Sequence, residues 1–409
     1  MAERPFRFIA AGDLRLERPV AGLSTVPEAL AAPLIDAPYD AARRVFDAAL
    51  ASPVDFLLLV GRLTDVSVAG PRGCLFLLTQ FERLAAREVP VYLLEPHGAS
   101  DWPAQLTLPA NVIRLNSVDG GTIPLMRDGR KLAVLHVPGD QRLTSASYVD
   151  PLLSDVSFTI VALADEAHAP RIPQQTTCVI YGGRTSRATQ PKGMGTAHWP
   201  GMIHSAGPDE LGPHGCTLLE WDLGALLPRV IPIDADPVRW LEQTVVLPRE
   251  LTLATLETML AEQAQQLAAQ NGDRTLLVRW KLQGSGTMAE SLRRQSVIEP
   301  LLGRLRDRVK TLSQAVWHAS IEMALAAPHV AHDDTLLDHY LQHFEGTAQA
   351  ESPAVESLFS LAEAAPAGWP TEQAARWITP PAEQDARQRI ISEAAWLGVD
   401  LLSAGENRR

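Results

Sequence analysis

The stretch Asp55–Asp65, with the sequence DFLLLVGRLTD, decides the fold of this chain. Its first half is a continuous apolar run of strand length, which predicts a fully buried β-strand. A glycine turn and polar residues follow at once. In open α/β sheets the functional crevice lies beyond the carboxyl ends of such strands. We therefore expect functional chemistry between Gly61 and Asp65, where the first polar residue is Arg62.

Strands and helices alternate on both sides of this stretch. We predict strands at Phe6–Ala11, Asp55–Val60 and Val89–Leu94, and helices at Asp40–Leu50, capped by Asp40, and at Cys74–Arg87. Val20–Pro38 and Gly70–Gly73 are rich in breaker residues and are predicted to be loops. The alternation is typical of a layered α/β domain.

Strands dominate the next part of the chain. They are predicted at Asn111–Leu115, Lys131–Val137, Ser157–Leu163, Thr177–Tyr181 and Cys216–Trp221. These strands follow the alternating strands and helices and would form a second sheet. We therefore predict two facing β-sheets flanked by helices.

The character of the sequence changes near Asp234–Pro237. We predict a βαβαβ module beyond it, with strands at Arg239–Val246, Arg274–Gln283 and Gln314–Ile321 and helices at Thr252–Ala269 and Ala289–Leu312. The rest is acidic and mostly helical, and Glu383–Leu402 carries an apolar stripe that packs either on its own domain or on a partner. The predicted domains are residues 1–236, 237–327 and 328–409.

Composition limits the classes of function. The 409 residues carry a net charge of −12, which argues against a surface that binds nucleic acid everywhere but permits a local basic cleft. Three cysteines without a CxxC motif indicate a reducing cytoplasm. No apolar run reaches 18 residues, so we expect no membrane span.

The loops after the strands resemble those of the calcineurin-like metallophosphoesterases, and most closely the SbcD-like DNA repair exonuclease group. Gly61–Asp65 lies where that family has Gly-Asp-Leu-Phe-Asp. The other matching segments are Phe8–Leu16, Ala42–Asp47, Val91–Leu94, Tyr181–Gly182, Pro200–Gly201 and Gly212–Cys216. The resemblance implies a four-layer sandwich with a small α+β capping module, and two divalent metals, usually manganese, that hydrolyse phosphodiesters.

The metal ligands that this resemblance implies are mostly replaced. The first aspartate is present as Asp13, but the histidine two residues later is Arg15 and the metal-bridging aspartate is Arg62. The expected asparagine, the catalytic histidine and the remaining ligands fall on His97, Gly98, Ala99, Ala164, Gly183 and Thr185.

These replacements conflict with a dimetal centre on physical grounds. Two metals concentrate roughly four positive charges, which carboxylates and neutral imidazoles normally offset. Two guanidiniums in the same pocket would repel the metals by several kcal/mol even at an effective dielectric constant near 20. We expect no bound metal or other cofactor, and an ion pair between Asp13 and Arg15 or Arg62.

Other polar residues suggest alternative sites. His97, Asp101, Asp165, Glu166 and His168 could rebuild a metal site, although scattered loop residues of this kind are usually solvated; His198, His204 and His214 form no ligand motif. The cleft arginines Arg15, Arg62, Arg184 and Arg187, with Asp65 and His204 nearby, could hold a phosphate group or could form structural ion pairs.

Three functional hypotheses follow. The first is a catalytically inactive relative of SbcD-like nucleases, acting as a scaffold or regulatory partner of an SMC-like coiled-coil ATPase in DNA repair. The second is an active phosphoesterase or exonuclease that uses manganese at an altered site. The third is a non-catalytic module that binds DNA or phosphate through the arginines. The resemblance also implies a possible homodimer.

Overall fold

A computed structural model describes residues 4–96, 102–103, 106–116, 118–139, 158–166, 176–193, 195–222, 227–248, 251–284, 287–292, 295–312, 316–323 and 339–340. The chain is a mixed α/β protein, as the sequence predicts. Contacts divide it into two compact units, and the first comprises residues 1–244, 251–281 and 294–322. The second comprises residues 245–250, 282–293 and 323–409.

The first six-stranded sheet contains the strand that the opening stretch predicts. Its order is β12 (Arg229–Asp234), β11 (Gly215–Trp221), β1 (Phe6–Ala11), β2 (Phe56–Val60), β3 (Val91–Leu94) and β4 (Val112–Leu115). Strands β1 to β4 are parallel, and β11 pairs antiparallel with both β1 and β12. Every residue of β2 is buried, because both faces of the sheet are covered.

The second six-stranded sheet is formed by later strands. Its order is β5 (Gly121–Arg127), β6 (Arg130–Val137), β7 (Phe158–Leu163), β8 (Cys178–Tyr181), β10 (Gly195–Trp199) and β9 (Ala188–Lys192). Its four central strands are parallel, and the two edge strands pair antiparallel with their neighbours.

The two sheets pack face to face through an aromatic core. Phe8 of β1 stacks on Phe56 of β2 with ring centroids 4.6 Å apart, and Phe6 stacks on Phe158 of the second sheet at 5.9 Å. Alternate residues of both sheets fill the same buried cluster. This packing gives the two facing sheets of the predicted sandwich.

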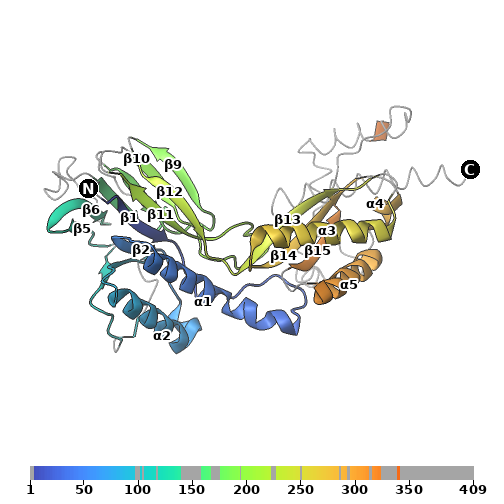
Figure 1. Cartoon of the computed structure of the whole chain (residues 1–409), viewed down its shortest axis with the longest axis horizontal. Helices are drawn as coiled ribbons and strands as arrows, with labels where there is room; N and C mark the ends of the chain where they lie inside the picture. The colour runs from blue at the N-terminus through green and yellow to red at the C-terminus, as the bar shows by residue number, and fades with distance from the viewer. Residues whose placement is uncertain are drawn as a thin grey trace, which may run out of the picture. The chain divides into compact units, whose positions relative to one another are not determined.

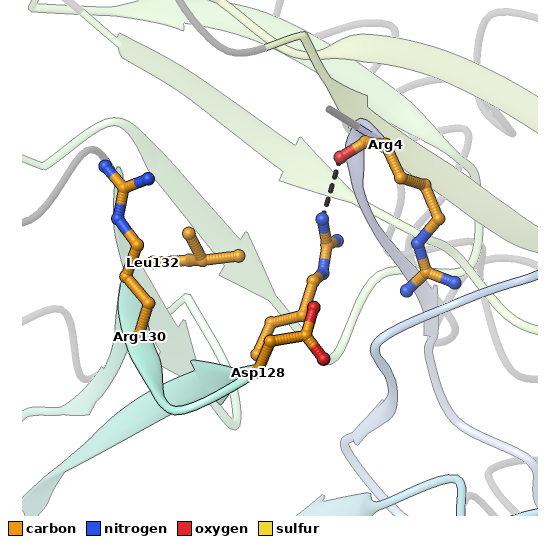
Figure 2. Close-up of a pocket in the computed structure, with 5 residues that line it drawn as sticks. Arg4, Asp128, Arg130 and Leu132 are labelled. Atoms are coloured by element: carbon orange, nitrogen blue, oxygen red, sulfur yellow. Dashed lines mark hydrogen bonds between the residues drawn. The ribbon is translucent and has the colours of Figure 1, made fainter. Parts of the chain in front are cut away.

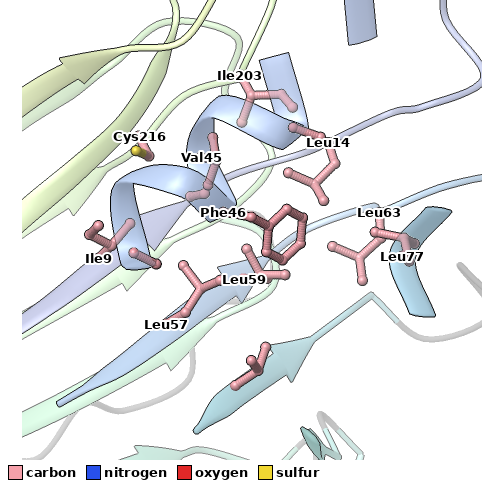
Figure 3. Packing of buried hydrophobic residues seen from close by; sticks show 14 of the residues in the cluster. Ile9, Leu14, Val45, Phe46, Leu57, Leu59, Leu63, Leu77, Ile203 and Cys216 are labelled. Atoms are coloured by element: carbon pink, nitrogen blue, oxygen red, sulfur yellow. The ribbon is translucent and has the colours of Figure 1, made fainter. Parts of the chain in front are cut away.

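Helices α1 (Glu28–Ala51) and α2 (Val66–Ala85) cover the other face of the first sheet. Figure 3 shows Val45 and Phe46 of α1 meeting Leu57 and Leu59 of β2 and Leu77 of α2. Among the described residues, the buried cluster on the other face of the second sheet contains strand residues alone, so the complete four-layer arrangement stays a prediction.

The predicted loop at Val20–Pro38 is wrong in its second half. Helix α1 begins at Glu28 and contains Pro33 and Pro38, and Asp40 lies in its interior beside Arg43 instead of capping it. Proline costs the helix backbone hydrogen bonds. Leu30, Leu34, Ala37 and Ala41 nevertheless continue one buried face at helical spacing, and that burial maintains the helix.

Helix α2 begins earlier than predicted. Asp65 is its N-cap and accepts a hydrogen bond from the Ser67 N–H, so the first turn forms before the predicted loop. Gly70 (φ 62°, ψ −159°) then kinks the helix, and Pro71 follows. The glycine and proline therefore mark a kink and not a complete loop.

A three-stranded sheet follows in the order β13 (Val238–Val246), β14 (Thr275–Gln283) and β15 (Val316–Met323). Helix α3 (Leu253–Asn271) begins one residue after the predicted start, and Thr252 is its N-cap. The single helix predicted at Ala289–Leu312 is two helices, α4 (Thr287–Leu292) and α5 (Gln295–Leu312). The three domain ranges stay a prediction.

Four strands were not predicted. Three of them, β5, β9 and β12, lie at sheet edges and contain Pro124, Pro191 and Pro232. Proline is tolerated at an edge because one side of the strand has no neighbour. The predicted helix at Glu383–Leu402 lies outside the described residues. Within the described residues, no helix is long and apolar enough to cross a membrane.

Candidate functional site

Asp13 stands where the loops after three strands meet. It follows β1, its side chain is almost fully buried, and its Oδ1 accepts a hydrogen bond from the Arg62 N–H, 3.0 Å away, in the loop after β2. Its Oδ2 accepts one from the Gly183 N–H, 3.0 Å away, in the loop after β8. One carboxylate therefore ties together loops from both sheets of the sandwich.

Two glycines allow the loops to approach this closely. Gly61 has φ +89°, and a Cβ on it would lie 2.7 Å from Asp13 Oδ2. A Cβ on Gly12 would lie 2.3 Å from the carbonyl oxygen of Gly201. Both distances are too short for any side chain, so the crevice is closed around Asp13 by main chain.

Arg15 supplies the positive charge that faces Asp13. Its Nε lies 3.6 Å from Asp13 Oδ1, a separation that makes an ion pair but not a hydrogen bond. The Arg15 backbone has φ +45°, which is unusual for a residue other than glycine, and its N–H donates to the carbonyl oxygen of Arg62 at 3.3 Å. The predicted Arg–Asp pairing is confirmed for Arg15.

Arg62 has a different role from the one that charge alone suggests. Its main chain donates to Asp13, while its side chain is exposed and makes no hydrogen bond or ion pair with another described residue. Asp65 is committed to capping α2, and the hydrogen bond from the Ser67 hydroxyl lowers the pKa of that carboxyl. Neither side chain forms a hydrogen bond or an ion pair with the Asp13 carboxylate, whose described partners are two main-chain N–H groups and Arg15.

The other two predicted arginines are held elsewhere. Arg184 donates to Glu166 at 3.0 Å and lies over the Trp199 ring, 4.2 Å from its centroid. Arg187 donates to the carbonyl oxygens of Cys216 and Ile233 and lies 3.5 Å from Asp234. The four arginines therefore do not converge into one phosphate-binding cluster.

Three buried histidines surround the loops without forming a ligand set. His204 Nδ1 donates to the Ser205 carbonyl oxygen, and His214 Nδ1 donates to that of Gly212. Burial lowers the pKa of both rings, and it lowers the pKa of His198 to about 4. Neutral imidazoles can ligate metals, but no three His, Cys, Asp or Glu side chains in the described residues are grouped to hold one.

Several candidates from the sequence cannot be placed. His97, Gly98, Asp101 and His168 lie outside the described residues. Of the carboxylates proposed for a rebuilt site, Glu166 is paired with Arg184, 3.0 Å away. The three cysteines are all buried, and burial raises the pKa of each thiol, as is typical of unreactive core cysteines.

The described residues do not fit the two-metal centre that the resemblance implies. Asp13 already accepts an N–H on each oxygen, and the Arg15 guanidinium occupies the position beside it. Arg62 lies at the position of the metal-bridging aspartate, but its side chain is a cation, and only its main-chain N–H contacts Asp13. A dimetal site needs several converging anionic or neutral donors, and the described part of this crevice presents one.

A comparison with known proteins agrees with the fold. The chain is similar to a metallophosphoesterase. It is 33% identical over 132 residues to the uncharacterized metallophosphoesterase YhaO of Bacillus subtilis (strain 168), a match that covers 32% of this chain and 32% of that protein. The matched part thus spans about a third of the relative's length. No family model matches the chain.

Sequence reasoning missed the main-chain donors of the site. The N–H groups of Arg62 and Gly183 hold Asp13, yet nothing in the identity of those residues marks them as donors. The only signal was indirect, because both positions follow the ends of strands in one predicted sandwich. For the contact between Gly12 and Gly201, the only signal in residue type is the glycine at each position, which does not identify its partner.

Proposed function

We propose that this chain is a metallophosphoesterase-type protein without metal-dependent hydrolysis, in which the crevice at Asp13 organises the fold instead of reacting with a substrate. One observation carries this proposal: both oxygens of Asp13 accept main-chain N–H groups while Arg15 supplies the neighbouring cation. The similarity to a metallophosphoesterase supports the scaffold, and the replaced ligands support the loss of chemistry.

Metal binding at this point would oppose several interactions at once. A divalent cation on Asp13 would meet the Arg15 guanidinium at ion-pair distance, and like charges in a partly buried site repel strongly. It would also compete for oxygens that already accept hydrogen bonds from Arg62 and Gly183. The other described positions at which the resemblance implies metal ligands, Ala164, Gly183 and Thr185, carry no carboxylate that could offset this repulsion.

The proposal is tested with manganese. We expect that Mn²⁺ at millimolar concentration leaves the thermal unfolding midpoint of the full chain unchanged, and that any hydrolysis of bis(p-nitrophenyl) phosphate or linear DNA is equal in the native protein and in Asp13→Asn. Manganese-dependent hydrolysis that disappears in Asp13→Asn would instead establish the active phosphoesterase or exonuclease.

The biological role that we propose is that of a scaffold or regulatory partner in DNA repair, associated with an SMC-like coiled-coil ATPase. This part rests on the resemblance of the strand-end loops to SbcD-like nucleases, which is independent of the geometry at Asp13. Size-exclusion chromatography of the full chain with such an ATPase tests it, with a variant that lacks residues 383–402. Association that survives this deletion would exclude the predicted C-terminal helix as the contact.

A second candidate function is binding of DNA or phosphate without chemistry. The exposed Arg62 side chain favours it, since that side chain makes no hydrogen bond or salt bridge with another described residue. Arg184 and Arg187 argue against a larger cluster, because both are engaged in structural contacts. This candidate predicts salt-sensitive DNA binding that weakens in Arg62→Ala with Arg184→Ala, and unchanged binding in that double variant would eliminate it.

A further inference from the structure

Helix α3 ends in an asparagine–glycine pair, Asn271–Gly272. The other asparagines of the chain precede valine, serine and arginine, at Asn111, Asn116 and Asn407. In an asparagine–glycine pair, the glycine main-chain nitrogen can attack the side-chain carbonyl carbon of the asparagine, because these atoms close a five-membered ring. Glycine carries no Cβ that would hinder the attack. The end of α3 is therefore a place where the main chain can react with its own side chain.

Arg239 polarises the side-chain carbonyl of Asn271. Its Nη1 donates to Asn271 Oδ1 at 3.1 Å, while Asn271 Nδ2 donates to the Leu267 carbonyl oxygen at 2.8 Å. The Arg239 guanidinium is fixed in this position by Asp234 and Asp236. A cationic donor on Oδ1 stabilises the negative charge that this oxygen gains when a nucleophile adds to the carbonyl carbon. The side chain of Asn271 is thus held as an activated electrophile.

Arg274 acts on the other reacting group. Its Nη1 donates to the main-chain carbonyl oxygen of Asn271 at 3.0 Å. That carbonyl and the Gly272 N–H belong to one peptide group, so a cation on the oxygen favours loss of the proton from the nitrogen. The deprotonated nitrogen is the nucleophile of the ring closure. Arg239 and Arg274 therefore assist the two partners of one reaction.

Gly272 leaves room for the ring to close. Its backbone has φ +66°, and among the described residues a Cβ built on it would meet Arg274 Nη1 alone, at 4.0 Å. Gly272 is exposed and Asn271 is half-buried, so water reaches the pair. The peptide can rotate here without displacing a packed side chain.

The turn between β5 and β6 provides a contrast. Asp128 also precedes a glycine, Gly129, and Figure 2 shows its carboxylate at the edge of a cavity that Arg4 and Arg130 also line. Aspartate is ionised at neutral pH, and an ionised carboxylate resists attack by a nucleophile. A following glycine is therefore not sufficient, and the neutral amide of Asn271 is what makes its turn reactive.

We propose that Asn271–Gly272 is a site of spontaneous deamidation. The Gly272 nitrogen loses its proton to the solvent and forms a bond to Asn271 Cγ. The bond between Cγ and Nδ2 breaks, and Nδ2 takes up protons and leaves as ammonia. Water then opens the cyclic imide, yielding aspartate by attack at the side-chain carbonyl and isoaspartate by attack at the main-chain carbonyl. One water is consumed and one ammonia is released.

The modification places a negative charge beside two arginines. Aspartate keeps the course of the main chain and sets a carboxylate within reach of Arg239, whose Nη1 lies 3.1 Å from the present Oδ1. Isoaspartate adds a methylene to the main chain at the end of α3. Arg239 also bonds Asp234 of β12, so the modification changes the charge where α3 meets that strand. The site shares no residue with the Asp13 crevice and does not depend on the function proposed for it.

Incubation of the full chain at mildly alkaline pH, followed by peptide mass spectrometry, tests this proposal. We expect the peptide that contains Asn271 to acquire the mass of the deamidated product, faster at higher pH because the Gly272 nitrogen must lose a proton. The Asn111 peptide is the internal control and should stay unmodified. Asn111 precedes a β-branched valine, and its Oδ1 has no hydrogen-bond partner among the described residues.

Three variants separate the contributions. Gly272→Ala should lose the modification within the same incubation, because the new Cβ hinders the attack. Arg274→Gln removes the charge on the Asn271 carbonyl and should slow the reaction about tenfold. Arg43→Ala removes an exposed arginine of α1 and should leave the rate unchanged. An unfolded variant would react faster, so the expected slowing cannot arise from loss of the fold.

Two results would overturn the proposal. The first is an unmodified Asn271 in the native chain after an incubation that fully converts a synthetic peptide of residues 267–275. The second is a rate in Arg274→Gln equal to or above the native rate while circular dichroism shows a folded variant, which would remove the assistance assigned to Arg274.

Discussion

Arg15 and Asp13 form an ion pair, with Nε 3.6 Å from Oδ1, at the place where the metallophosphoesterase resemblance implies a metal. The pair is unequal in burial, because the Arg15 side chain is 31% exposed and the Asp13 side chain only 5%. An exposed partner contributes little through charge alone. The stabilising role of Asp13 therefore rests mainly on its two main-chain hydrogen bonds.

Replacing Asp13 by alanine should destabilise the fold clearly. The change leaves the N–H groups of Arg62 and Gly183 without their acceptor, and each such loss costs about 1–3 kcal/mol. We expect the free energy of unfolding, measured with urea, to fall by about 2–5 kcal/mol. Asp40→Ala is the control, because Asp40 is exposed and contacts Arg43 at the surface. Equal small losses in both variants would contradict the role assigned to Asp13.

Gly61→Ala should be at least as disruptive as the loss of Asp13's hydrogen bonds. The backbone of Gly61 has φ +89°, which costs a non-glycine residue about 1–3 kcal/mol, and the new Cβ would lie 2.7 Å from Asp13 Oδ2. We expect a lower thermal midpoint and a smaller soluble yield. Gly207→Ala is the matched control, since no atom lies within 4 Å of its added Cβ. A Gly61→Ala protein as stable as this control would show that the loops can separate.

The sequence predicted the buried strands well and the edges poorly. Strand β2 and its neighbours are continuous apolar runs, and burial on both faces selects such runs directly. Strands β9 and β12 are partly exposed and contain proline, so their pairing depends on the neighbour and not on their own composition. The first half of helix α1 was missed for a related reason: tertiary packing of Leu30 and Leu34 outweighs Pro33.

The candidate site was predictable in its charges but not in its geometry. The pairing of Arg15 with Asp13 follows from the need to neutralise a buried carboxylate. The contacts of Arg187 could not be predicted in this way. Its acceptors are the main-chain carbonyls of Cys216 and Ile233, more than twenty-five residues away along the chain. Such contacts are set by how the strands assemble, and side-chain identity carries little information about them.

Asp236→Ala should be among the most destabilising changes in the first unit. Asp236 has no exposed surface and accepts hydrogen bonds from Arg239 Nε at 2.6 Å and Nη2 at 2.8 Å, while Arg274 lies 3.4 Å away. Removing one partner of a buried pair costs about 3–5 kcal/mol, and Asp234, 2.9 Å from Arg239, offsets part of this. Urea unfolding should show a loss near the lower end of that range.

The control for Asp236 is an exposed ion pair in the same region. Asp273 is 78% exposed and bonds Arg44 at 3.0 Å, so Asp273→Ala should cost less than about 1 kcal/mol. If Asp236→Ala were as mild as Asp273→Ala, the Arg239 network would contribute no more than a surface pair does.

His318 should make the protein sensitive to acid. The ring is buried, its Nδ1 accepts a hydrogen bond from Trp280 Nε1 at 2.9 Å, and burial together with the Arg306 charge lowers its pKa to about 4. The unfolded state, with an ordinary histidine pKa near 6.5, binds the proton first as pH falls. Stability is therefore complete above about pH 6.5 and decreases as pH falls from 6.5 to 4.

The size of this effect can be isolated with His318→Gln. A depressed pKa of this magnitude corresponds to about 3 kcal/mol per histidine, and the buried His198, with its pKa near 4, should act in the same direction. Glutamine keeps an acceptor for Trp280 but does not titrate, so urea midpoints measured between pH 7.5 and 5 should fall less steeply than in the native chain. His339→Gln, at an exposed position, should leave the slope unchanged. A native-like slope in His318→Gln would mean that His318 is protonated in the folded protein at the same pH as in the unfolded chain.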